Sequence, residues 1–196
     1  MVDIIDSIER GLADSNQKYL CLTLIWAMGD HAHRHQHSEV MRKIYALLLQ
    51  PEEMFTLGTE ARHSSFYILA ELLVHNCSER HLDFWQWIFE KIEKFYRYSV
   101  DKCREAQQGA GCEEVLKNLL SNLLKIYRKC MLLLAEEEQF LADKLDQLLG
   151  LVCDFLDFRQ GEVYQATLKQ VRELLAAKKE VVVHLPNFLK LLEKLT

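Results

Sequence analysis

The chain has 196 residues, of which 49% are apolar and 27% charged, and its formal net charge is −5. This composition supports a buried core and excludes a disordered chain, which combines low hydrophobicity with high charge. Because the sequence holds only 7 glycines and 2 prolines, it excludes a collagen-like chain and disfavours sandwiches and barrels, which need many tight turns. The mild acidity offers no global reason to bind nucleic acid or an anionic membrane.

Apolar periodicity predicts helices along the whole chain, with the residues between them as polar turns. In chain order the predicted helices cover about 2–12, 15–29, 38–49, 60–73, 78–105, 113–134, 137–158, 163–175 and 186–195. Gly29 is interpreted as the end of the second helix, which makes Asp30–His37 a polar linker. Val181–Val183 is assigned to helix or coil because no partner strand is evident.

The three longest predicted helices have unusually wide apolar faces. Projected at ~100° per residue, their apolar positions span roughly 180–200°, whereas a simple surface helix needs about 100°. Such helices pack against neighbours on two sides, which is typical of stacked helical hairpins. We therefore expect a single all-α domain over 1–196, with eight or nine amphipathic helices stacked as antiparallel hairpins. A compact multi-helix bundle is the alternative, and the break at Gly109–Gly111 marks where a subdivision would fall.

The stretch Glu60-Ala-Arg-His-Ser-Ser-Phe-Tyr-Ile-Leu-Ala-Glu-Leu-Leu-Val-His75, followed by a turn at Asn76–Ser78, resembles the second helix of an armadillo or HEAT-type repeat. The resemblance is one of general pattern, and no fixed internal repeat accompanies it. It implies a scaffold or adaptor role.

The compartment follows from the cysteines and from what the N-terminal residues lack. The 6 cysteines form no Cys-x-x-Cys motif, and four lie in apolar helical segments, as reduced thiols do. Met1–Asp6 shows no signal-peptide pattern, and the most apolar window, Tyr19–Met28, is about half of the ~20 residues that cross a bilayer. We read that window as a buried helix, and we expect a protein of the cytoplasm or nucleus without membrane attachment.

No nucleophile, phosphate-loop or dinucleotide motif is present, so we expect no enzyme, no catalytic residues and no cofactor. The metal candidate that we retain is a histidine cluster in which alternate residues form i, i+4 pairs if the segment is helical. Its members are His31, His33, His35 and His37. A polar linker that tolerates neutral histidines is the competing interpretation, and a metal-binding helical protein is the alternative function. A second group, His75, Cys77 and His81, is interpreted instead as a buried thiol and two helix-end histidines.

Two charged ridges are predicted on neighbouring helices. The basic ridge comprises Lys117, Lys125, Arg128 and Lys129, and the acidic ridge comprises Asp143, Asp146, Asp154 and Asp157. Each reads as a solvated face or as a surface that steers a charged partner. Because no aromatics interleave with the basic ridge, nucleic-acid binding is disfavoured; a nucleic-acid or chromosome-associated subunit is kept as a further alternative.

The aromatic surplus of the fifth predicted helix supplies the candidate partner site. Trp85 and Trp87 point roughly 200° apart, so a single narrow core face cannot hold both. Trp87 and Tyr98 lie at one edge of the apolar arc, beside Lys91 and Lys94. These four residues are predicted to bind another protein, as a helix or an extended peptide laid in a groove. The leading hypothesis is thus a non-enzymatic interaction scaffold or adaptor.

Overall fold

The computed structural model describes residues 2–12, 14, 17–35, 38–50, 65–105, 110–156 and 185–195, together with 169, 172 and 176. All regular structure in these residues is helical, and no strand occurs among them. The all-α prediction is confirmed. Of the helix predicted over 163–175, only Lys169 and Arg172 are described, and both are helical. Val181–Val183 lies outside the described part of the chain.

The chain divides into two compact units, Met1–Lys102 and Cys103–Thr196. The boundary falls before the Gly109–Gly111 break. The helices of the first unit are α1 (Val2–Leu12), α2 (Lys18–Arg34), α3 (Ser38–Leu48), α5 (Ser65–Glu71), the π-helical turn η2 (Leu72–Asn76) and α6 (Leu82–Glu105), whose last turn enters the second unit. The second unit continues with α7 (Ala110–Leu133), α8 (Glu138–Leu156) and α11 (Pro186–Leu195).

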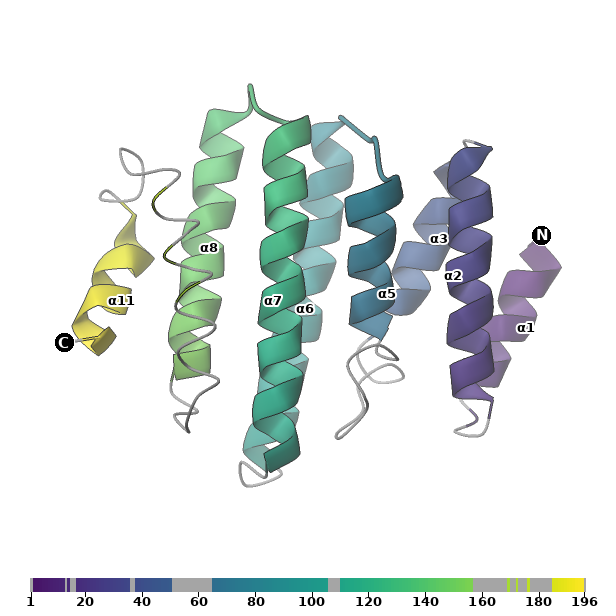
Figure 1. The fold of residues 1–196 in the computed structure, drawn as a ribbon, viewed down its shortest axis with the longest axis horizontal. Coiled ribbons are helices and arrows are strands. Elements are labelled where there is room, and N and C mark those ends of the chain that lie inside the picture. Colours follow the sequence, from purple (N-terminus) through teal and green to yellow (C-terminus); the bar gives the residue numbers. More distant parts are fainter. Residues whose placement is uncertain are drawn as a thin grey trace. The chain divides into compact units, whose positions relative to one another are not determined.

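The first unit packs its helices in two layers. In Figure 1, α2 and α5 lie in front of the fainter α1, α3 and α6. Helix α2 contacts α1, α3, α5 and η2, so it holds the unit together. Its inward residues include Ile25, which is buried with Ile44 of α3 and Leu69 of α5. The apolar residues whose spacing predicted these helices are therefore the ones that form the core.

Helix α2 does not end at Gly29, as the sequence suggested, but continues to Arg34. Gly29 is instead a point of close packing, because a Cβ built there would lie 2.8 Å from Leu72 Cδ1. The glycine therefore serves an approach between α2 and η2 rather than a helix end. The linker predicted over 30–37 is helical through Arg34, and Gln36 and His37 lie outside the described residues.

Helix α6 begins at Leu82, later than predicted, after a link without regular structure over 77–81. The side chain of Glu79 accepts hydrogen bonds from the backbone N–H groups of Arg80 and His81, each at 3.1 Å. The indole N–H of Trp85, which is fully buried, donates to the Glu79 carbonyl at 2.8 Å. These hydrogen bonds satisfy backbone N–H and C=O groups of residues 79–81. In a helix that began at residue 78, the same groups would bond within the helix instead.

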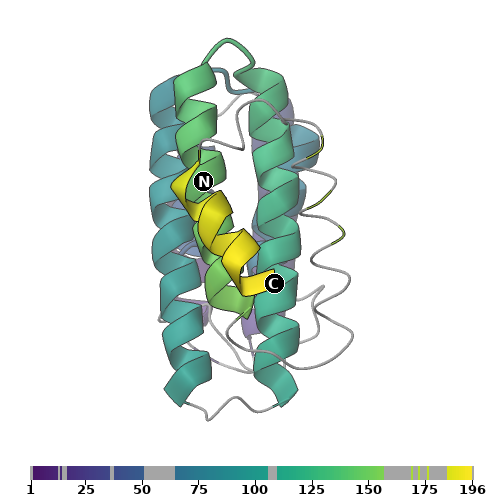
Figure 2. The same ribbon diagram turned by 90° about the vertical axis from the view of Figure 1, so that its left-hand side faces the viewer.

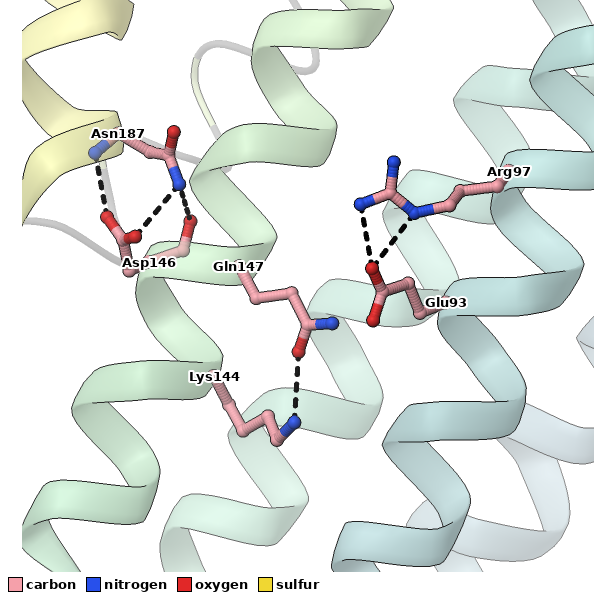
Figure 3. Close-up of polar contacts among 6 residues, drawn as sticks. All are labelled: Glu93, Arg97, Lys144, Asp146, Gln147 and Asn187. Atoms are coloured by element: carbon pink, nitrogen blue, oxygen red, sulfur yellow. Dashed lines mark hydrogen bonds and ion pairs between the residues drawn. The ribbon is translucent and has the colours of Figure 1, made fainter.

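In the second unit, α7 and α8 form a hairpin with a short turn (Figure 1). The buried Tyr127 hydroxyl of α7 donates to the Leu141 carbonyl of α8 at 2.8 Å. Helix α11 packs obliquely on α8, as Figure 2 shows in yellow. Asp146 of α8 binds the start of α11, because it accepts the Asn187 backbone N–H at 2.8 Å and the Asn187 side-chain amide at 2.8 Å (Figure 3).

All six cysteines are buried free thiols. Cys103 and Cys112 face each other at the ends of α6 and α7, where each Sγ points to the other residue's carbonyl at 3.9 and 3.7 Å. Burial and the neighbouring Cys112 thiol raise the pKa of Cys103 to about 12. The thiols therefore behave as small hydrophobes.

Candidate functional site

Helix α2 exposes large apolar side chains on the face opposite its core contacts. At ~100° per residue, its inward positions occupy about one third of the circumference, centred on Ile25. On the outer half of the helix, Tyr19 and Trp26 project from one flank and are 59% and 53% exposed. Leu20 and Leu24 are also exposed and project from the other flank, roughly 100–160° further round the helix. We call these four residues the α2 face. The expectation that Tyr19–Met28 is a buried helix is therefore wrong for half of its circumference.

A groove runs beside the α2 face, between α2 and α5. Its volume is about 310 Å³. Tyr19, Thr23 and Trp26, at i, i+4 and i+7, form one wall, and Tyr67 and Glu71 of α5 line the other. This is a mainly apolar, partly concave surface that offers three aromatic rings and one carboxylate. Exposed apolar surface of this kind marks interaction sites in proteins.

The four residues predicted as a partner site lie in one row on α6. Trp87, Lys91 and Tyr98 are half-buried, and Lys94 is exposed. The Trp87 ring packs 6.3 Å from the Phe84 ring, and Lys102 places its ammonium 5.6 Å from the Tyr98 ring. The row is thus an aromatic and basic edge whose rings are partly covered. Trp85 is the core member of the pair, with no exposed surface.

The basic ridge on α7 is a set of side chains with local partners. Lys117 pairs with Glu114 at 3.3 Å, and Lys125 donates to the Asn122 side chain at 3.3 Å. Arg128 is exposed, whereas Lys129 is half-buried. Pairs at i, i+3 spacing on one helix are what a solvated helical surface forms.

The acidic ridge on α8 contains one residue with a structural contact. Asp143 is exposed and accepts from Gln139 within the helix at 2.8 Å, whereas Asp146 holds the first turn of α11. Asp154 is half-buried, and Asp157 lies outside the described residues. Neighbouring Lys144 donates to Gln147 at 3.1 Å (Figure 3).

The histidine cluster is distributed over the end of α2. His31 and His33 lie within the helix and His35 follows it, with the rings of His31 and His35 4.4 Å apart. Asp30 pairs with Arg34 one turn later. Among the described residues, no three His, Cys, Asp or Glu side chains are grouped so as to hold a metal ion.

Sequence reasoning missed the α2 face, although a signal for it was present. Apolar residues surround α2 on all sides between Tyr19 and Met28, whereas α1 and α3 each carry a polar face. A helix that is apolar all round must cover its second face with another element. Other described helices cover only one side of α2, which leaves the second face exposed.

No family model, curated protein or solved structure matches this chain. Within the described residues, no helix combines the length and the hydropathy needed to span a bilayer.

Proposed function

We propose that this chain is a non-enzymatic interaction module that binds an amphipathic helix of another protein across the α2 face. The exposure of Tyr19, Leu20, Leu24 and Trp26 supports it. Tyr and Trp supply large contact areas at low entropic cost and dominate binding hot spots. An amphipathic helix offers the apolar stripe that a groove between two helices accepts. The six free cysteines favour action in the cytoplasm or nucleus.

The test compares three forms of the full chain as baits in cell extract: wild type, Trp26→Glu and Leu132→Glu. Leu132 is the matched control, because it is an exposed apolar residue in the other unit and lies far from α2 in the sequence. A partner of the α2 face is captured by wild type and Leu132→Glu but lost from Trp26→Glu. With that partner purified, Trp26→Ala should weaken binding by about 2 kcal/mol or more, which is roughly 30-fold in Kd.

Two results would contradict the proposal. The first is a set of captured proteins that is the same for Trp26→Glu and Leu132→Glu. The second is a concentration-dependent dimer, detected by light scattering, that Trp26→Glu abolishes; the α2 face would then bind a second copy of the chain. Because Trp26 is exposed, Trp26→Ala should change the free energy of unfolding by less than about 0.5 kcal/mol, so loss of binding would not reflect unfolding.

The α6 row offers the competing surface, and Trp87→Ala tests it in the same assay. If the partner binds α2, Trp87→Ala retains binding; it lowers stability, because half-buried Trp87 packs on Phe84. Loss of partner binding by a folded Trp87→Ala, with binding retained by Trp26→Ala, would move the site to α6.

A further inference from the structure

The first unit contains a second cavity, separate from the α2 groove, with a volume of about 470 Å³. It lies where the end of α2, the helix α3, the link 77–81 and the start of α6 meet. The buried part of its lining comprises Ala32, Met41, Tyr45, Cys77 and Phe84. The rest of the lining is polar or charged and comprises His33, Arg34, Arg42, Ser78 and Glu79. Sites for small molecules have this size, with polar groups that orient the ligand.

One polar group at this cavity is the hydroxyl of Tyr45. Tyr45 is only 2% exposed, and its ring packs edge-on against Phe84 with centroids 5.9 Å apart. Its hydroxyl makes no hydrogen bond with any other residue that the structure describes. Among the described residues, the side-chain atoms that lack both solvent contact and a hydrogen-bond partner are Gln50 Oε1 and Ser65 Oγ, so the Tyr45 oxygen stays accessible to water or to a molecule in the cavity. Burial, reinforced by the nearby Cys77 thiol, raises the pKa of Tyr45 well above its usual value, so the phenol keeps its proton and remains a donor.

Among the described cationic side chains that line the cavity, Arg42 is the one without an ion-pair partner, and the Glu79 carboxylate lies in the same lining. Arg34 is paired with Asp30. The Glu79 carboxylate accepts the backbone N–H groups of Arg80 and His81. Arg42, in contrast, forms no ion pair or hydrogen bond with another described residue. Arg42 and Tyr45 are i and i+3 on α3, so both project from the same side of the helix toward the cavity that they line.

From this arrangement we infer that the cavity binds a small molecule with a flat apolar body and a single carboxylate. The apolar body fills the space above Met41 and Phe84, the guanidinium of Arg42 pairs with the carboxylate, and the Tyr45 hydroxyl donates a hydrogen bond to the ligand. Arg suits this role because its planar fork matches the two oxygens of a carboxylate. The site is independent of the α2 face and of the protein partner proposed for it.

The probe for this site is 2-naphthoate, and its uncharged isostere 2-naphthamide is the comparison. Both are titrated into the full chain at pH 7.5 and followed by calorimetry and by ligand-observed magnetic resonance. We expect saturable binding of 2-naphthoate at one site, about tenfold tighter than 2-naphthamide, because a charged hydrogen bond exceeds a neutral one by about that factor. Arg42→Gln should remove this preference, whereas Lys43→Gln, an exposed neighbour on α3 that does not line the cavity, should retain it.

Tyr45→Phe, which changes the side chain only by loss of the hydroxyl, should weaken 2-naphthoate about three- to tenfold. Circular dichroism of each variant confirms that the helices are intact. The inference is overturned if 2-naphthoate shows no saturable binding at millimolar concentration, or if it binds no tighter than the amide. It is also overturned if Arg42→Gln keeps the preference, or if Trp26→Ala abolishes binding and so places the probe in the α2 groove.

Discussion

The contact of Asp146 with the first turn of α11 should contribute measurably to stability. Pro186, the first residue of α11, has no N–H, so the N–H of Asn187 is the first donor of the helix that needs an acceptor. Asp146 accepts that N–H at 2.8 Å and the Asn187 amide at 2.8 Å, and its backbone carbonyl accepts the amide at 3.1 Å. A carboxylate at this position also interacts favourably with the positive end of the helix dipole.

Asp146→Ala removes both carboxylate bonds but keeps the backbone carbonyl. A hydrogen bond to a charged group contributes about 1.5–3 kcal/mol when well shielded, and both residues here are half-buried. Discounting for solvent screening, we expect a total loss of about 2 kcal/mol. Asn187→Ala keeps the bond from its own N–H and should lose about 1 kcal/mol. Asp143→Ala, an exposed carboxylate on the same helix, is the control and should lose less than about 0.5 kcal/mol.

Urea unfolding gives the free energies, and hydrogen exchange of the α11 amides locates the effect. A local loss of about 2 kcal/mol accelerates exchange about 30-fold, and α11 should show it while the α7 amides change less. The double variant Asp146→Ala/Asn187→Ala should be less destabilised than the sum of the single variants, because the two residues share their bonds. If Asp146→Ala has no larger effect than Asp143→Ala, the contact does not stabilise α11 and the reasoning fails.

Three further predictions concern packing, a buried hydrogen bond and alkaline pH. Gly29→Ala should lower the free energy of unfolding by about 1–3 kcal/mol, because its Cβ would lie 2.8 Å from Leu72 Cδ1. In the Gly29→Ala background, Leu72→Val should restore part of that loss. If Gly29→Ala leaves the free energy of unfolding unchanged, η2 can shift to make room. Trp85→Phe should cost at least about 1 kcal/mol in urea unfolding, since the Glu79 carbonyl loses its 2.8 Å donor, and unchanged stability would mean that water replaces it. Folding raises the pKa of Cys103 from about 9 to about 12, so between these pH values the unfolded chain ionises the thiol while the folded protein keeps it protonated. The free energy of unfolding therefore keeps its full value below pH 9 and falls as the pH rises toward 12, by up to ~1.4 kcal/mol per pH unit. Cys103→Ala should therefore show a shallower decline over that range, and parallel declines would refute the assignment.

The local pattern of the sequence was enough to predict the helical class and most helix positions. Val2–Leu12 and the start of α11 at Pro186 agree with the structure, because apolar spacing and a first-turn proline act within one or two helical turns. The two boundaries that failed did so for different reasons: the end of α2 depended on a contact distant in sequence, and the start of α6 depended on nearby hydrogen bonds that compete with a helix. Gly29 resembled a helix end, but the structure packs Leu72 against it. The helix predicted from residue 78 begins at Leu82 instead, because the Glu79 side chain accepts the next two backbone N–H groups and its carbonyl accepts the Trp85 indole.

The candidate site shows the same division. Sequence alone indicated that aromatic side chains exceeded what a narrow core needs, but periodicity cannot tell which face of a helix meets a neighbour when both faces are apolar. The tertiary structure assigned Trp85 to the core, partly covered Trp87, and exposed Trp26 and Tyr19 on α2. Likewise Asp146 looked like one carboxylate of a ridge, and only the packing of α11 on α8 gave it a specific partner. Burial is a property of the assembled helices, so it follows from which elements pack together rather than from the amphipathicity of any one of them.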